Sequence, residues 1–324
     1  MGWLSVIRSL LVLGVLALAA MLLALAMGSV TIPLPDLWQV VQGEGSALNR
    51  TLLLDLRLPR ALAAFATGGL LGVAGALMQV LLRNPLADPY ILGVSGGAAV
   101  GALLAMLAGM GTLLISGSAF AGAMLAIVLV FGLAHGTGSW TPTRLLLTGV
   151  VVASGWGAVI TLMLAITPSY KLPGMLYWLM GDVSYARTPW PALVVLVVSI
   201  VLIMPLARNL NVLARGPMQA AALGVSVRPL EWTVYLFAGL LTATAVTTAG
   251  SIGFVGLIVP HMLRLVLGND QRIILPASAL AGGTLLVLAD TLARTVVAPE
   301  QLPVGVITAL LGVPMFLYLL HRSR

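Results

Sequence analysis

The sequence has no cysteine and a single lysine, Lys171, and charged residues make up only 8% of its 324 positions. Soluble domains carry about 25% charged residues, so this scarcity excludes an ordinary soluble protein. Without cysteine the chain cannot form disulfides, thiolate metal sites or a cysteine nucleophile. The net charge of +7 is not accompanied by a basic cluster with interleaved aromatic residues. We therefore expect a polytopic membrane protein with membrane lipid, and no nucleic acid, among its partners.

Motifs for nucleotide hydrolysis and metal binding are also missing. No Gly-x-x-x-x-Gly-Lys-Ser/Thr loop occurs, so the chain cannot hold ATP phosphates in the P-loop manner. The three histidines, at 135, 261 and 321, lack metal-ligand spacing, which predicts a structural role for His261. We expect neither enzymatic activity nor a cofactor, and energy for an active process must come from another subunit.

Ten apolar runs predict an all-α integral membrane protein, because about 17–25 such residues cross a bilayer. They lie at 4–27, 60–82, 90–109, 113–134, 144–166, 191–207, 231–249, 253–267, 273–293 and 303–320. The run at 253–267 is short, and Pro260 predicts a broken helix that does not cross fully. The first run resembles a signal peptide, but its length of about 18 apolar residues exceeds a signal core and favours a spanning helix. The arginine distribution favours cytoplasmic N- and C-termini, which leaves long outer connectors at 28–59 and 167–190, with a short interfacial helix at 175–180.

A polar connector with two prolines, residues 83–89, lies between the second and third spans. Proline ends the preceding helix and keeps the turn extended. Glycines that follow at 93, 97 and 101 repeat every four residues, as do those at 68 and 72. This small-xxx-small spacing predicts helices whose backbones touch in lipid.

The longest inner connector is 208–230. Its part from 211 to 224 predicts one short helix, in which Pro217 suits the first turn and Gly224 the C-terminal stop. Such a helix outside the lipid is either a contact for a soluble partner or a simple surface connector, and the residues alone leave both open.

Several further motifs follow one another in a characteristic order. They are Arg57-Leu58-Pro59-Arg60, Gly75-Ala76-Leu77-Met78-Gln79, Thr143-Arg144-Leu145-Leu146-Leu147, Gly253-Phe254-Val255-Gly256-Leu257-Ile258-Val259-Pro260-His261, Leu302-Pro303-Val304-Gly305 and Gly312-Val313-Pro314. Through these motifs, over residues 55–320, the chain resembles the FecCD-type permeases, the membrane subunits of ABC importers for iron-siderophore complexes, haem and vitamin B12.

The resemblance implies a type II ABC importer permease with about ten helices, in which residues 1–324 form a single transmembrane domain in a bacterial inner membrane. A second copy would complete a homodimer, with the translocation path at its axis. Two ATP-binding cassette ATPase subunits would dock on the inner side and a periplasmic substrate-binding protein on the outer side. The cargo would be a metal chelate, and iron-siderophore, haem and cobalamin all stay open.

The resemblance also assigns the inner connector 208–228 as the coupling segment that inserts into a groove of the ATPase. The matching residues are Leu213, Arg215, Gly216, Pro217, Ala221, Leu223 and Gly224. Relatives commonly carry an acidic residue where Pro217 stands and an arginine where Ala221 stands. The joint loss of both charges predicts a correspondingly altered groove on the ATPase.

Two further sites follow from the resemblance. Arg57, Arg60 and Arg294 match arginines that pair with glutamates of the binding protein, and pairing within the chain to Asp55 or Asp290 is the alternative. Because Asp290 and Arg294 are four residues apart in one predicted helix, we expect that they form a structural ion pair.

The second site, at Thr141, Pro142 and Thr143, matches the cytoplasmic gate. The alternative for these residues is a plain helix start with Thr143 as its cap.

Two other classes of protein were weighed against the ATP-driven importer. An ion-coupled secondary transporter would carry intramembrane acids or unwound helices near the midplane, but charges here collect at span ends. An intramembrane enzyme would need clustered nucleophiles or metal ligands at depth, and no such cluster occurs in the sequence.

Overall fold

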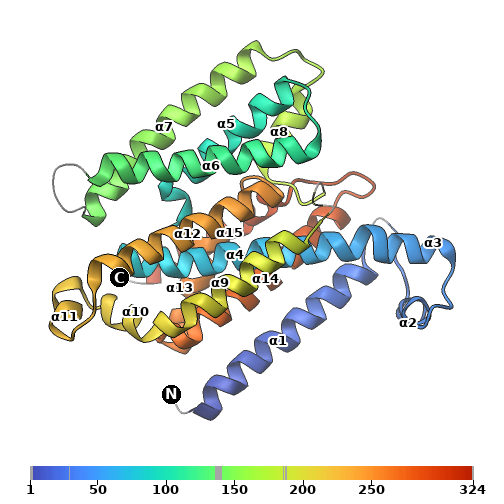
Figure 1. Ribbon diagram of the computed structural model, residues 1–324. Helices are drawn as coiled ribbons and strands as arrows, with labels where there is room; N and C mark the ends of the chain where they lie inside the picture. Colours follow the sequence, from blue (N-terminus) through green and yellow to red (C-terminus); the bar gives the residue numbers. More distant parts are fainter. Residues whose placement is uncertain (1–2, 29, 136–140, 185, 187, 323–324) are drawn as a thin grey trace.

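The computed structural model describes residues 3–28, 30–135, 141–184, 186 and 188–322, and within this part all regular elements are helices (Figure 1). Among the described residues, seven helices are long and apolar enough to cross a membrane. Three shorter apolar helices, Val94–Leu107, Val255–Leu267 and Val304–Leu319, complete a set that corresponds to the ten predicted spans. The prediction of an all-α, multi-pass membrane protein is confirmed.

The helices follow the order α1 (Trp3–Ala26), α2 (Leu34–Gln42), α3 (Ala47–Arg50), the π-helix η1 (Thr51–Arg57), α4 (Leu58–Leu81), the 3₁₀-helix η2 (Pro89–Leu92), α5 (Val94–Leu107), α6 (Thr112–His135), α7 (Pro142–Ile166), α8 (Leu172–Met180), α9 (Trp190–Ile203), the 3₁₀-helix η3 (Met204–Leu206), α10 (Ala207–Leu213), α11 (Pro217–Ala222), α12 (Val227–Ala249), α13 (Val255–Leu267), α14 (Gln271–Thr295) and α15 (Val304–Arg322).

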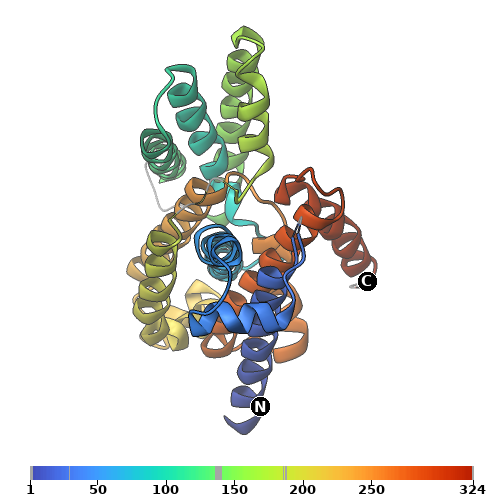
Figure 2. The ribbon, with the colours of Figure 1, turned by 90° about the vertical axis from the view of Figure 1, so that its right-hand side faces the viewer.

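Helix α4 forms the centre of the bundle, and Figure 2 shows it end-on with the other helices around it. Its sequence is rich in alanine and glycine, and every residue from 66 to 81 is buried. A Cβ atom added at Gly68 would lie 2.1 Å from the carbonyl oxygen of Gly282 in α14, and one at Gly75 would lie 1.8 Å from that of Gly256 in α13. The close backbone contact predicted from the small-residue spacing is therefore confirmed.

The two ends of the bundle differ (Figure 1). Helices α2 and α3 and the π-helix η1 lie at one end, which we call the α2 end. Helices α10 and α11 lie at the other, the α11 end, toward which α1 begins and α15 finishes. The predicted connector 28–59 thus contains helices, and the predicted helix at 175–180 is confirmed within α8.

The predicted break of the helix at Pro260 is wrong, because α13 continues through this residue. In a regular helix the N–H of residue 260 would bond to the carbonyl of Gly256, and proline removes that donor. The carbonyl oxygen of Gly256 instead lies against Gly75 of α4. With its 13 residues, α13 is about 20 Å long, which is less than the hydrocarbon thickness, as its short apolar run predicts.

The polar connector between α4 and α5 is held by its own side chains. Asn84 Oδ1 accepts from the N–H of Leu86 at 2.9 Å, and Asp88 Oδ1 accepts from that of Tyr90 at 2.7 Å. The Tyr90 hydroxyl donates to the carbonyl of Ile252 at 3.1 Å and accepts from its N–H at 3.0 Å. These bonds fix the connector against the loop between α12 and α13.

Candidate functional site

A cavity of about 580 Å³ at the α2 end brings Arg57, Arg60 and Arg294 together, and we call it the arginine cavity. The three residues come from η1, α4 and α14. Cations in this number at one end of a membrane protein need compensation or a ligand, because an unpaired buried charge is costly.

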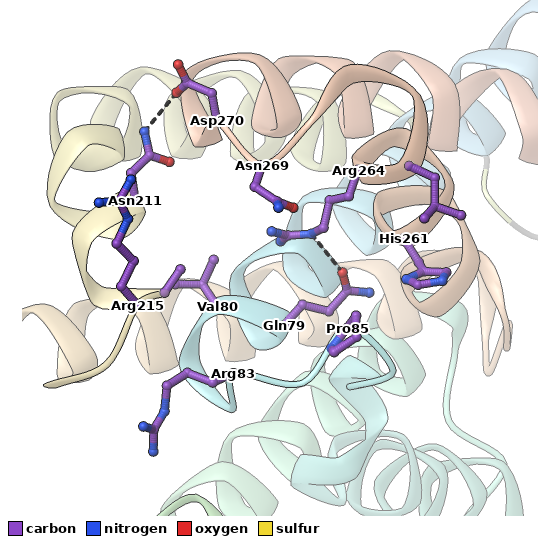
Figure 3. A pocket seen from close by; sticks show the side chains of 12 residues that line it. Gln79, Val80, Arg83, Pro85, Asn211, Arg215, His261, Arg264, Asn269 and Asp270 are labelled. Carbon is purple, nitrogen blue, oxygen red and sulfur yellow. Dashed lines mark hydrogen bonds between the residues drawn. The ribbon is translucent and has the colours of Figure 1, made fainter. Parts of the chain in front are cut away.

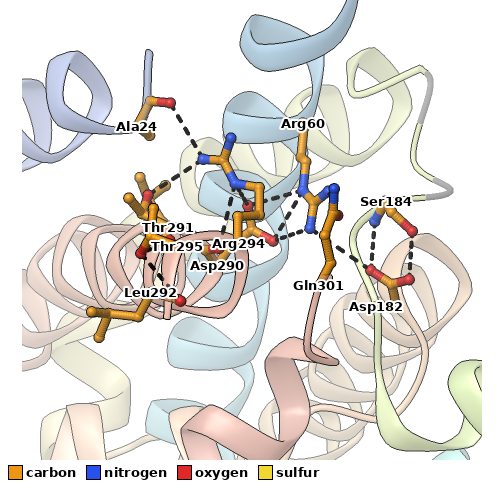
Figure 4. Close-up of polar contacts among 11 residues, drawn as sticks. Ala24, Arg60, Asp182, Ser184, Asp290, Thr291, Leu292, Arg294, Thr295 and Gln301 are labelled. Carbon is orange, nitrogen blue, oxygen red and sulfur yellow. Dashed lines mark hydrogen bonds and ion pairs between the residues drawn. The ribbon is translucent and has the colours of Figure 1, made fainter. Parts of the chain in front are cut away.

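Asp290 supplies part of that compensation (Figure 4). It is 1% exposed, and its Oδ1 lies 2.8 Å from Arg60 Nη2 while its Oδ2 lies 3.2 Å from Arg294 Nε. The predicted pair of Asp290 and Arg294 is confirmed. The alternative given for the arginines, pairing within the chain to Asp290, is also confirmed for Arg60, although 230 residues of sequence separate the two.

Arg57 is compensated by carbonyl groups instead. Its Nη1 donates to Leu25 at 2.6 Å and Ala26 at 3.0 Å, and its Nη2 donates to Val30. Asp55, the other predicted partner, is exposed and forms no ion pair in the described part of the chain. The guanidinium of Arg57 is therefore oriented by the end of α1, and its charge is not neutralised.

The arginine cavity therefore holds one guanidinium group, that of Arg57, that forms no ion pair in the described part of the chain. Asp290 lies between Arg60 and Arg294, Asp182 lies 4.0 Å from Arg60, and the exposed Asp55 also lines the cavity without an ion pair. Guanidinium groups bind carboxylates through strong, charge-assisted hydrogen bonds. The cavity is chemically suited to receive an acidic side chain.

At the α11 end, the prediction of one helix over 211–224 is wrong. Helix α10 ends at Leu213, and Gly216 has a φ of 125°, a conformation that only glycine adopts readily, so the chain turns before α11 starts at Pro217. Pro217 occupies the first turn as predicted, and Gly224 follows the end of α11 with a φ of 79°.

Helix α11 presents an apolar surface. It buries Ala220, whereas Met218 is 87% and Leu223 is 70% exposed, and Ala221 is exposed beside them. Large apolar side chains this exposed outside a membrane span indicate a contact surface. Sequence reasoning missed Met218, although a methionine just inside a short helix was the signal that could have pointed to it.

At the start of α7, the structure places the predicted gate residues together. Thr141 is the N-cap and accepts from the N–H of Arg144 at 3.2 Å, and Pro142 occupies the first helical position. The helix start given as the alternative for these residues is present, but its cap is Thr141, and Thr143 is exposed. Proline is favoured at this position because no helical donor is lost there.

Within the described residues no group of three His, Asp or Glu side chains could hold a metal ion. His261 lies in α13, and its Nδ1 is buried without a hydrogen-bond partner.

Known proteins with similar sequences or structures span nearly the whole chain. The ABC transporter permease protein YvrB of Bacillus subtilis is 40% identical over 94% of this chain and 91% of its own length. The hemin transport system permease protein HmuU of Yersinia pestis is 38% identical over 97% of this chain and 96% of its own length. A solved metal-chelate type ABC transporter in an inward-facing conformation superposes with a TM-score of 0.86, at 30% identity, over 97% of this chain and 99% of its own.

The helical bundle, with a charged cavity at one end and an exposed short helix at the other, is that of a permease subunit of the ABC importer type. The chain belongs to the FecCD transport family, whose sequence model matches residues 16–322.

Proposed function

We propose that this permease moves a metal chelate, such as an iron-siderophore, haem or cobalamin, from the periplasm to the cytoplasm across a bacterial inner membrane. Two copies work with two ATP-binding cassette ATPase subunits and a periplasmic binding protein, and both termini are cytoplasmic. The α2 end then faces the periplasm and the α11 end faces the cytoplasm. The observation that carries the proposal is the convergence of the three predicted docking arginines on one cavity at the α2 end.

The arginine cavity supports docking of an acidic side chain from the binding protein. The side chain of Arg60 is 12% exposed, against 6% for that of Arg294, and Arg57 is 7% exposed as a whole residue. Arg57 and Arg294 lie deeper and contribute their charge to the cavity. Such charges set the rate and register of docking more than its affinity.

The test is the ATPase activity of the reconstituted complex with and without a binding protein loaded with each chelate. We expect Arg60→Gln to weaken stimulation by the matching loaded protein about tenfold, because one of the cations that the incoming carboxylate meets is removed. Arg50→Gln is the matched control, since Arg50 is exposed at the same end but does not line the cavity. Uptake driven by an ion gradient, with no dependence on an ATPase, would overturn the proposal.

The exposed apolar face of α11 supports its role within the coupling segment 208–228. Leu213 is 2% exposed, so it holds the end of α10 against the bundle. Because α10 leads into α11, this also holds Met218 and Leu223 in place for contact with a partner. Motion of an ATPase groove holding this face would pass into α10 and α12 and switch the permease between outward-open and inward-open states.

We expect Met218→Asp or Leu223→Asp to reduce co-purification of the ATPase by tenfold or more, because a carboxylate placed in an apolar groove loses its hydration. Tyr170→Asp is the control: Tyr170 is 80% exposed and lies just before α8, away from α11. Undiminished co-purification with both α11 variants would show that the ATPase docks elsewhere.

Helix α7 supports a second copy as partner. Only 11% of its most apolar window is buried within the chain, and Gly155 and Gly157 have no heavy atom within 4 Å of an added Cβ. This surface of small residues is open to a neighbouring permease and to a bulky cargo at the dimer axis. The residues at the start of α7, Thr141, Pro142 and Thr143, would then constrict the path at the cytoplasmic end.

A further inference from the structure

A second cavity, of about 780 Å³, lies at the α11 end, and one of its lining residues, Arg215, also belongs to the proposed coupling segment (Figure 3). Its basic lining residues are Arg83 after α4, Arg215 after α10 and Arg264 of α13, with His261 beside Arg264. We call it the basic cavity.

The three arginines form no ion pair within the described part of the chain. Arg264 donates only to neutral groups, from Nε to Gln79 Oε1 at 3.2 Å and from Nη2 to the carbonyl of Ala76 at 3.1 Å. Glu231 lies within electrostatic range of Arg83 without pairing with it. The basic cavity therefore keeps a positive charge that its own walls do not neutralise.

Among the described residues, Asp270 is the one carboxylate that lines the basic cavity, and it is already engaged. Asp270 Oδ2 lies 2.6 Å from Arg272 Nη2, and Asp270 Oδ1 accepts from Asn211 at 2.8 Å. The hydrogen bonds from Arg272, more than those from Asn211, lower the pKa of Asp270 to about 2. Its charge is thus shared with Arg272 outside the cavity, which leaves the other guanidinium groups to attract an anion.

An apolar surface continues from the basic cavity. Leu265, which lines the cavity, is 63% exposed, and the adjacent Val266 is 68% exposed. Both belong to the last turn of α13, one of the shorter apolar helices, so they offer an apolar surface directly beside the cavity. A ligand that fills the cavity and follows this surface has an anionic head and an apolar tail.

We propose that the basic cavity binds the phosphate headgroup of an anionic phospholipid, with an acyl chain along Leu265 and Val266. Basic pockets between membrane helices at the cytoplasmic side bind such headgroups, and guanidinium groups match phosphate geometry. The cavity is too large for a single carboxylate side chain, and an acidic segment of the ATPase would leave the apolar surface uncovered. The inference rests on the proposed function for placing the α11 end in the cytoplasmic leaflet.

The test uses the full-length permease alone, delipidated in detergent, with phosphatidylglycerol or phosphatidylcholine added back. Native mass spectrometry counts retained lipid, and the thermal midpoint reports stabilisation. We expect wild-type protein to retain phosphatidylglycerol at least tenfold better than phosphatidylcholine. The double variant Arg83→Gln/Arg215→Gln, which spares the hydrogen bonds of Arg264, should lose that preference.

Arg208→Gln is the matched control, because Arg208 is exposed on α10 and does not line the basic cavity. It should keep the preference for phosphatidylglycerol. Equal retention of the two lipids by wild-type protein, or an unchanged preference in the double variant, would overturn the proposal.

Two further measurements distinguish an anionic lipid from a free phosphate ester and from an acidic segment of the ATPase. Stabilisation by soluble glycerophosphate equal to that by phosphatidylglycerol would show that the apolar surface adds nothing, and would replace the lipid by a free phosphate ester. Loss of ATPase co-purification in the double variant, with lipid retention unchanged, would assign the arginines to subunit docking. Because lipid retention is measured without the ATPase or the binding protein, failure of this inference is distinct from failure of the importer function.

Discussion

Replacing Asp290 with asparagine should destabilise the protein by about 3–5 kcal/mol, because it leaves two buried guanidinium groups without their shared counter-charge. Asp290 is 1% exposed and bonds both Arg294, which is 5% exposed, and Arg60, whose other nearby carboxylate is that of Asp182 at 4.0 Å. The measurement is the thermal midpoint of the purified permease in detergent, together with the yield of folded protein.

Asp182→Asn is the matched control. Asp182 lies 4.0 Å from Arg60 and also accepts from the N–H of Ser184 at 2.8 Å, a contact that asparagine can keep. It should shift the midpoint little. The double variant Arg60→Gln/Asp290→Asn should recover part of the loss, since one uncompensated cation is removed with the carboxylate. A midpoint unchanged in Asp290→Asn would show that the charges are compensated by other groups.

The spans could be predicted from the sequence because membrane insertion depends on local composition. Most predicted boundaries fall within about four residues of those in the structure, as for 144–166 against α7 and 273–293 against α14. The small-residue spacing of α4 and α5 likewise predicted close contact without identifying the partner helix. Such signals are local, and a single sequence carries them in full.

Other features depend on partners distant in the chain and could not be predicted. Pro260 is accommodated because the carbonyl it frees lies against Gly75. The sequence offered Asp55 and Asp290 as partners of the arginines, but only the packing of α4 on α14 selects Asp290 for Arg60. The three arginines predicted to dock the binding protein were identified by a resemblance, and only the fold shows that they all line one cavity. The coupling segment was also expected to be one helix, since the sequence does not reveal the positive φ of Gly216.

Alanine at Gly75 should have the other large effect, a destabilisation of about 3 kcal/mol with a strong loss of folded protein. The added Cβ would lie 1.8 Å from the carbonyl oxygen and 2.5 Å from the carbonyl carbon of Gly256. Both are backbone atoms, so no side-chain rotation relieves the clash, and α13 must move away from α4. The thermal midpoint in detergent and the fraction of monodisperse protein measure this loss.

Gly117→Ala in α6 is the matched control and should have the opposite sign. No heavy atom lies within 4 Å of a Cβ added at Gly117, and alanine favours the helix over glycine by about 0.5–1 kcal/mol. The contrast follows from one physical difference: glycine at 75 makes room for another backbone, whereas glycine at 117 faces the surroundings of the chain. Equal midpoints for the two variants would mean that α4 and α13 are packed more loosely than the structure shows.

Because α13 also carries Arg264 and the apolar surface beside the basic cavity, a displaced α13 should weaken phosphatidylglycerol retention in Gly75→Ala but not in Gly117→Ala.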